Sequence, residues 1–209
     1  RVETDANTLL VMLPGEKTGL RYVPKKLAPH VLARLQANPS YSNKPGTLGV
    51  CAGDFDGDEI PDLFFTYPFG GHRLFRNLGG LRFEDVTEET GLAALCADHW
   101  GGGCCFADYD GDGDLDLFVA GVGDVNLLLE NLNGKRFRDR AADLGLSHEG
   151  PNVQMAFADY DLDGDLDGYL VTNRETDQPK PAKDLRVQAT VKNGVPLIEE
   201  KHREVFDVV

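Results

Sequence analysis

Aspartates at a fixed spacing are the residues of this chain that can do chemistry. Three segments, residues 53–65, 107–119 and 158–170, each carry aspartates at relative positions 1, 3, 5 and 9. A tightly curled loop turns every second side chain inward, so these carboxylates and a carbonyl at position 7 supply the roughly six or seven oxygens that Ca²⁺ prefers. Mg²⁺ fits less well, because it keeps water ligands and needs a nearly ideal octahedron. We therefore expect about three calcium ions, one per segment.

The expected ligands form three sets in one register. They are Asp54, Asp56, Asp58, Ile60 and Asp62; Asp108, Asp110, Asp112, Asp114 and Asp116; and Asp159, Asp161, Asp163, Asp165 and Asp167. The position-7 residue of each set is expected to offer its backbone carbonyl. Glycines within the sets (Gly57, Gly111 or Gly113, and Gly164) allow the positive φ angles that such loops need.

These loops differ from EF-hands and from ordinary solvated turns. An EF-hand has Glu at position 12, where this chain has Phe65, Val119 and Leu170. The flanking runs are short and rich in β-branched and aromatic residues, which predicts strands rather than helices. Solvated turns do not require four carboxylates at fixed offsets in three copies, and a cluster without a cation would repel itself. We therefore expect metal-binding loops that each join two strands.

The elements that position these loops repeat with a period of about 50 residues. Asp54 recurs as Asp108 and again as Asp159, and many apolar residues recur at the same offsets. The first copy contains four apolar runs of strand length, at residues 49–52, 63–67, 74–75 and 83–86. A unit of this size with four short strands is typical of a propeller blade. The predicted fold is all-β, with blades of four antiparallel strands and calcium-binding hairpin loops.

The motif also resembles a known family. Asp-x-Asp-Gly-Asp-x-x-x-Asp-Leu, followed by Leu74-Phe75-Arg76-Asn77 and later by Gly91-Leu92, is similar to the FG-GAP/VCBS-type repeats of integrin-α-like β-propellers, and most similar to secreted bacterial relatives of cartilage acidic protein. The resemblance covers about residues 47–173 and implies that the aspartates bind Ca²⁺ between blade strands. The literal Gly-Ala-Pro of the integrin form is missing, although Phe69-Gly70-Gly71 lies in a comparable region. A closed ring in this family needs several more blades, so the resemblance implies an incomplete propeller.

The predicted organisation has three parts. Residues 1–46 lie outside the repeat and are expected to be a lead-in with one helix at residues 25–37. Residues 47–173 hold the repeats, divided as 47–97, 98–149 and a partial 150–173. Residues 174–209 are expected to be an insertion or linker with a hairpin over residues 186–198, around Asn193-Gly194. We expect further repeats or a partner chain to complete the third blade and the ring.

The four cysteines leave several interpretations open. Cys51 and Cys105 share one repeat position and are expected to be small buried hydrophobes. A disulfide between Cys96 and Cys104, or between the neighbours Cys104 and Cys105, is an alternative, and the connectivity is undetermined. A catalytic thiol would need a histidine partner, and His99 lies three residues after Cys96. Proximity within a loop does not fix the geometry of such a pair, so the catalytic interpretation is disfavoured.

Other side chains point to packing rather than catalysis. Trp100 is expected to pack at a blade edge rather than to bind a sugar, and His99 and His148 to form hydrogen bonds between blades rather than to ligate metal. The sequence contains no Ser/His/Asp signature, no phosphate-binding glycine loop and no basic patch with aromatic residues.

Composition limits the partners. The chain has 209 residues and a net charge of −14, which disfavours nucleic acids and anionic lipid surfaces. It has no apolar stretch approaching the ~20 residues of a membrane span. We predict a non-enzymatic, calcium-stabilised binding or adhesion module, located outside the cell, in a periplasm or on a cell surface, with a protein or glycan ligand. The alternatives are a non-catalytic or substrate-shaping part of a secreted polysaccharide-degrading enzyme and a structural subunit of a larger assembly.

Overall fold

The computed structural model describes residues 13–21, 49–68, 70–172, 189–192 and 195–198. It divides into two compact units, Arg1–Thr172 and Asn173–Val209. The helix predicted over residues 25–37 lies outside the described residues.

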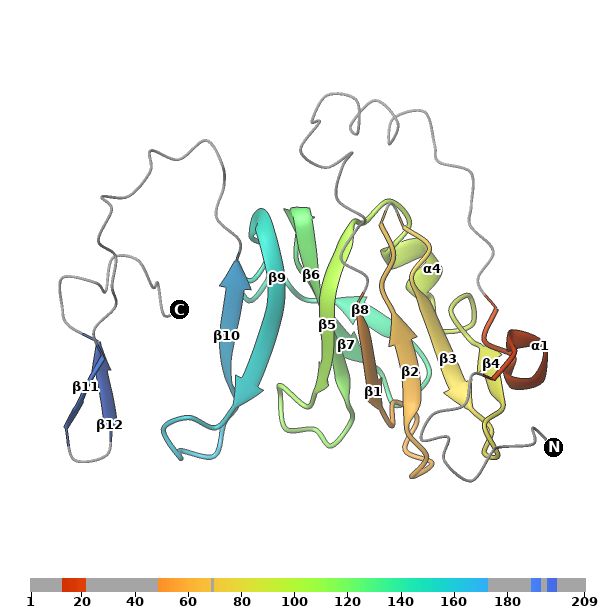
Figure 1. The fold of residues 1–209 in the computed structure, drawn as a ribbon, viewed down its shortest axis with the longest axis horizontal. Coiled ribbons are helices and arrows are strands. Elements are labelled where there is room, and N and C mark those ends of the chain that lie inside the picture. Colours follow the sequence, from red (N-terminus) through yellow and green to blue (C-terminus); the bar gives the residue numbers. More distant parts are fainter. Residues whose placement is uncertain (1–12, 22–48, 69, 173–188, 193–194, 199–209) are drawn as a thin grey trace, which may run out of the picture. The chain divides into compact units, whose positions relative to one another are not determined.

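The first repeat is a four-stranded antiparallel sheet, as predicted (Figure 1). Its strands β1 (Val50–Gly53), β2 (Asp62–Phe65), β3 (Arg73–Asn77) and β4 (Phe83–Asp85) pair in chain order. The register pairs Ala52 with Leu63 and Leu63 with Phe75. Each strand coincides with one of the short apolar runs, because the Gly, Asn and Asp clusters between them favour turns.

The second repeat has the same strand order, and the described residues of the third repeat form its first two strands. The strands are β5 (Gly101–Ala107), β6 (Asp116–Val125), β7 (Leu127–Asn131), β8 (Phe137–Asp139), β9 (Glu149–Ala158) and β10 (Asp167–Thr172). The end of β6 also pairs with the start of β9, which joins the second and third repeats into one six-stranded sheet. The sheets formed by the described residues do not close into a ring.

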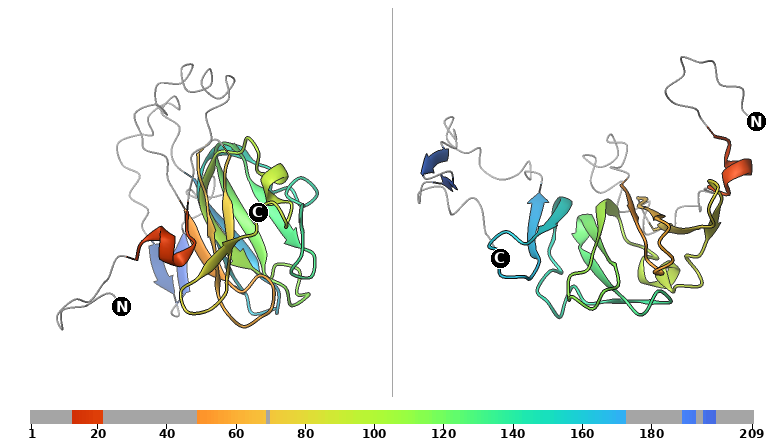
Figure 2. Two further views of the ribbon diagram at one scale, coloured as in Figure 1. Left: turned by 90° about the vertical axis from the view of Figure 1, so that its right-hand side faces the viewer. Right: turned by 90° about the horizontal axis from the view of Figure 1, so that it is seen from below.

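The blades follow one another side by side (Figure 2), and a hydrophobic core lies between each successive pair. The first core joins Phe64 and Leu74 of the first blade to Leu117 of the second. The second core joins Phe118 of the second blade to Met155 of the third. Because side chains alternate across a strand, consecutive residues of β6 enter different cores, and residues 117–120 are at most 1% exposed. Each blade therefore depends on its neighbours for burial.

The described residues also form two short helices and a hairpin. The helices α1 (Gly15–Thr18) and α4 (Leu92–Leu95) have four residues each and were not predicted, since one turn leaves no periodic pattern in the sequence. Strands β11 (Ala189–Lys192) and β12 (Val195–Ile198) pair with each other, which confirms the predicted hairpin. They form a two-stranded sheet of their own. Among the described residues no helix is long and apolar enough to cross a membrane.

Candidate metal centres

The three aspartate loops share one backbone conformation. Each loop joins the first and second strands of its blade, and all three lie at the lower ends of these strands in Figure 1. Positive φ angles occur at positions 4 and 6 of every loop. These residues are Gly57 and Glu59, Gly111 and Gly113, and Leu162 and Gly164. The glycines were predicted to take this role, whereas Glu59 and Leu162 were not.

The position-1 aspartate closes each loop by accepting backbone hydrogen bonds. Asp108 accepts from the amides of Asp112 and Gly113, both at 3.1 Å. Asp159 makes the equivalent pair of bonds in the third loop, and Asp54 accepts three amides in the first. The carboxylate therefore fixes the curl of the loop before any cation is added.

Position 5 supports position 7 in the same way in all three copies. The Asp58 carboxylate accepts the amide of Ile60 at 2.8 Å. The same bond runs from Asp114 to Asp112 and from Asp165 to Asp163. These contacts order the position-7 residue, and the use of its carbonyl as a ligand stays a prediction.

The position-9 aspartate anchors the loop to the blade. Asp62 is fully buried and accepts the amides of Asn77 at 2.7 Å and Phe55 at 3.1 Å. Burial raises the pKa of Asp62 to about 6, although the two backbone hydrogen bonds lower it. Asp116 has equivalent partners and a pKa raised to about 6 for the same reason. Asp167 in the partial third blade is exposed.

Each loop brings three carboxylates together, with oxygens within 4.8 Å of one another. The groups are Asp54, Asp56 and Asp58; Asp108, Asp110 and Asp116; and Asp159, Asp161 and Asp167. The other predicted carboxylates belong to the same loops but stand outside these close groups. They are Asp62, Asp112, Asp114, Asp163 and Asp165. Clustered carboxylate oxygens on a preformed loop suit a hard cation such as Ca²⁺.

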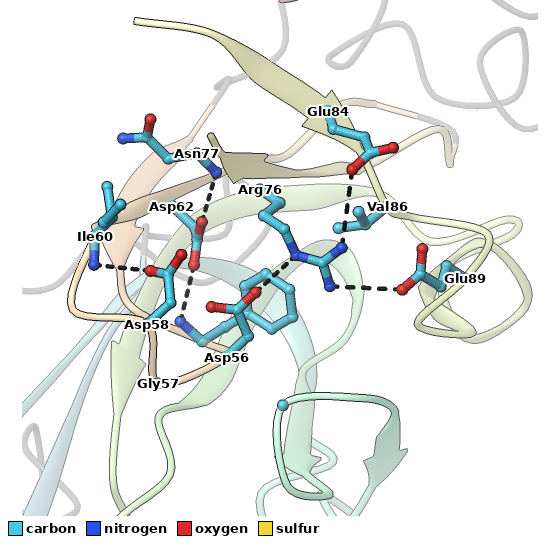
Figure 3. A network of polar contacts seen from close by, with 12 residues as sticks. Asp56, Gly57, Asp58, Ile60, Asp62, Arg76, Asn77, Glu84, Val86 and Glu89 are labelled. Carbon is cyan, nitrogen blue, oxygen red and sulfur yellow. Dashed lines mark hydrogen bonds and ion pairs between the residues drawn. The ribbon is translucent and has the colours of Figure 1, made fainter. Parts of the chain in front are cut away.

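An arginine that the sequence did not reveal contacts the first loop (Figure 3). The Arg76 Nε atom on β3 donates to Asp56 Oδ2 at 2.7 Å, and the guanidinium also contacts Glu84 and Glu89 at 3.9 and 3.5 Å. The other Asp56 oxygen, Oδ1, is buried and has no hydrogen-bond partner. Such an oxygen, beside two more carboxylates, fits the requirement of a bound cation.

The second blade covers the first loop. The Asn131 side chain donates to the Phe55 carbonyl at 2.7 Å, and the Phe137 and Phe55 rings lie 6.2 Å apart. A Cβ atom placed on Gly134, in the β7–β8 turn, would lie 2.8 Å from the Asp56 Cα atom. The first loop is thus supported by the blade that follows it.

A buried pair of histidines, His72 and His99, forms hydrogen bonds between the first two blades. The Tyr67 amide donates to His72 Nδ1 at 3.0 Å, so His72 Nε2 carries the proton and donates to His99 Nδ1, also at 3.0 Å. His99 Nε2 then donates to the Val125 carbonyl at 2.8 Å. Burial lowers the pKa of His72 to about 3, which keeps His72 neutral. The inter-blade hydrogen bonding expected for His99 is present.

The remaining candidates have packing roles in this structure. Trp100 is 4% exposed, in agreement with packing. All four cysteines carry free thiols, so neither of the two disulfides considered from the sequence is formed. Cys51 and Cys105 are only half-buried, and the fully buried thiols are Cys96 and Cys104.

Comparison with known proteins assigns these loops to a family. FG-GAP-like repeats match residues 54–119 and 108–170, which together include all three aspartate loops. The chain belongs to the FG-GAP-like repeat family. Its loops and four-stranded sheets are therefore FG-GAP-like repeats, as the motif resemblance implied.

Two relatives of this FG-GAP-like chain share one name. Cartilage acidic protein 1 of Xenopus tropicalis is 31% identical over 143 residues, which cover 67% of this chain and 22% of the relative. Cartilage acidic protein 1 of Homo sapiens is 29% identical over 172 residues, which cover 81% of this chain and 25% of the relative. The chain thus spans about a quarter of the length of these relatives.

Proposed function

We propose that this chain is a non-catalytic, calcium-stabilised β-propeller module that works outside the cell and binds a protein or glycan ligand. The observation that carries the proposal is the repetition of one carboxylate frame. Three loops of different sequence share two positive φ angles and the same backbone hydrogen bonds, and each holds three carboxylates together.

Calcium would neutralise charge that the fold otherwise concentrates. The loops contain fourteen aspartates, equal in number to the net charge of −14. Residues at positions 1, 3, 5 and 9 would hold the ion, with the carbonyl of position 7. Sites of this open type are useful where free calcium is close to millimolar, which supports an extracytoplasmic location. The membership of the FG-GAP-like repeat family supports the binding role.

The test is calcium titration of the full chain by calorimetry, with thermal unfolding in calcium, in magnesium and in chelator. We expect about three ions per chain, one per loop. A site at a hundredfold calcium excess over its Kd would add about 2.7 kcal/mol to the free energy of unfolding. Each such site would raise Tm by roughly 5–10 °C in a chain of this size. Magnesium should give a much smaller shift.

A matched pair of triple variants separates binding from charge. D56N/D110N/D161N removes one ligand from every loop, whereas E16Q/E88Q/E149Q removes the same number of charges from exposed positions outside the loops. Only the first triple variant should lose calcium binding and the Tm shift. Equal calcium binding by both would refute the calcium sites.

Ligand binding is tested on arrays of glycans and of extracellular matrix proteins, in calcium and in chelator. We expect calcium-dependent retention on one class. Retention on neither class would contradict the binding role while leaving the calcium sites intact.

A further inference from the structure

The first strands of two neighbouring blades run unusually close together. Thr66 ties them, since its hydroxyl accepts the Gly49 amide and donates to the Gly102 carbonyl, both at 2.6 Å. A Cβ atom placed on Gly49 would lie 2.5 Å from the Gly102 carbonyl oxygen. A Cβ atom placed on Gly53 would lie 2.8 Å from the Phe106 ring. Residues before and after Cys51 therefore contact β5, through the backbone at Gly49 and through the Phe106 side chain at Gly53.

This alignment sets Cys51 opposite Cys104. Gly49 faces Gly102 and Gly103, and Gly53 faces Phe106, so the residue midway on β1 faces the residue midway on β5. Both thiols belong to the hydrophobic core between the first and second blades, where Cys104 is 5% exposed. The neighbouring Cys104 side chain and burial both raise the pKa of Cys51.

The other two cysteines are placed differently. The Cys105 thiol donates to the Met155 carbonyl at 3.3 Å and packs in the core between the second and third blades. It therefore points away from its neighbour Cys104, as expected for consecutive residues of a strand. Cys96 directly follows α4 rather than lying on an inner strand.

We propose that Cys51 and Cys104 are a cross-linking site that joins the first two blades through a disulfide under oxidising conditions. A disulfide needs Cα atoms roughly 4.4–6.8 Å apart, a separation that strands in backbone contact can provide. The bond would close a long loop of chain between the two cysteines, and long loops gain most from a cross-link.

The oxidant is a small disulfide such as oxidised glutathione. Cys51, the more exposed thiol, loses its proton and attacks one glutathione sulfur; the glutathione S–S bond breaks and one reduced glutathione leaves with a proton. The Cys104 thiolate then attacks the Cys51 sulfur, forms the Cys51–Cys104 bond and releases the second glutathione, which takes up the remaining proton. Two cysteine thiols are oxidised and one glutathione disulfide is reduced to two thiols.

The test incubates the full folded chain with oxidised glutathione, alkylates the remaining thiols and maps disulfides by mass spectrometry of proteolytic peptides. We expect the intact mass before alkylation to fall by two hydrogen atoms and the peptide map to contain one pair that links Cys51 to Cys104. The Tm should rise by several degrees and return to its original value on reduction. C51S and C104S should each abolish this link, whereas C96S and C105S should retain it.

Three outcomes would overturn the proposal. They are a chain that keeps four alkylatable thiols after oxidation, a link from Cys104 to Cys96 or Cys105 in the wild-type chain, and a Cys51–Cys104 link that forms only after unfolding. The wild-type peptide map decides between these results even if a serine variant folds poorly. Because no step involves calcium, failure here would leave the calcium titration unaffected.

Discussion

At the scale of single residues, the loops differ most at one repeat position on the third strand of the blade. Arg76 holds this position in the first blade and contacts Asp56. Glu130 holds it in the second blade, where it pairs with Arg138 and Arg140. The pKa of Asp110 is raised mainly by burial and by the neighbouring charge of Asp112. The charge of Glu130 raises it further. The first loop thus has a neighbouring cation and the second a neighbouring anion.

This difference predicts opposite effects of two neutralising substitutions on calcium affinity. R76Q should tighten calcium binding at the first loop, and E130Q should weaken it at the second, each by about three- to tenfold at low salt. Both effects should shrink at high ionic strength because of screening. Calcium titrations followed by NMR, through the amides of Gly57 and Gly111, would report the two loops separately. A lower calcium affinity of the first loop in R76Q would mean that Arg76 acts by orienting Asp56 rather than through its charge.

The buried position-9 aspartates predict a pH dependence. The pKa values of Asp62 and Asp116 are raised from 3.8 to about 6 in the calcium-free fold. A raised pKa means that the calcium-free fold binds more protons than the unfolded chain at pH values between 3.8 and about 6. The contribution of these two groups to the free energy of unfolding is therefore complete below pH 3.8 and is lost as the pH rises through about 6. Calcium bound at the proposed sites would replace these protons.

The Tm difference between calcium and chelator should therefore be large at pH 7.5 and much smaller at pH 5. Unfolding scans in both solutions across this range would measure it. The mutant D62N/D116N serves as the control, and its remaining calcium response should vary less with pH. A calcium response equal at pH 5 and pH 7.5 in the wild type would contradict the linkage.

The residue scale also shows what a sequence can and cannot reveal about the site. Alternation of aspartates predicted the loops, because curled loops impose a local spacing on their ligands. Arg76 was not identifiable as a contact of Asp56, since the pairing depends on how β3 lies against the loop. The free Oδ1 atom of Asp56 likewise emerges only from packing by the next blade.

At the scale of elements, the three loops keep one conformation despite unfavourable residues in two of them. Glu59 and Leu162 have φ angles of 67° and 64°, where the other copies have glycine. A residue with a Cβ atom in this region costs roughly 1–2 kcal/mol. The hydrogen bonds of the position-1 aspartate must offset this strain.

Glycine at these positions should stabilise the chain. E59G and L162G should each raise the free energy of unfolding by about 1 kcal/mol, because release of strain exceeds the added flexibility of the unfolded state. The reciprocal control is G111A, at φ 73° with no atom within 4 Å of the new Cβ, which should destabilise by about 1 kcal/mol. Urea unfolding in chelator would measure all three, and an unchanged midpoint in G111A would show that these loops tolerate the strain.

Strand positions were largely predictable, whereas strand lengths were not. The short apolar runs located β1 to β4 because turn residues bound each of them. The extension of β6 to Val125 depends on pairing with β9, a long-range contact that leaves no local pattern. Helix α4 was missed because a single turn such as Leu92–Leu95 is set by the chain on both sides of it.

At the scale of the whole first unit, stability rests on contacts between blades. Asn131 bonds to its own blade through Leu115 and to the preceding blade through Phe55. The side chain of its repeat equivalent, Asn77, bonds within its own blade, to Pro61 and Gly79, among the residues that the structure describes. The two asparagines thus form a natural pair for measuring the interface.

N131A should destabilise the chain by about 2–4 kcal/mol, because it leaves buried backbone groups without partners. N77A, at a half-buried position where the side-chain hydrogen bond to Pro61 is exposed, should cost about 1 kcal/mol or less. N131A should also weaken calcium binding at the first loop, although the residue lies in the second blade. Chemical unfolding and the NMR titration would measure both effects, and equal losses in the two variants would exclude a role for the interface.

The position of Gly134 against Asp56 has a consequence for biosynthesis. A chain emerges from the ribosome with its N-terminus first, so the first loop is made well before the turn that covers it. That loop gains its contact with the β7–β8 turn only after this turn has been translated and has docked. Maturation of each such loop would then run one repeat behind synthesis, and a pause in translation after the first blade would leave a complete sheet with an unfinished ion-binding loop.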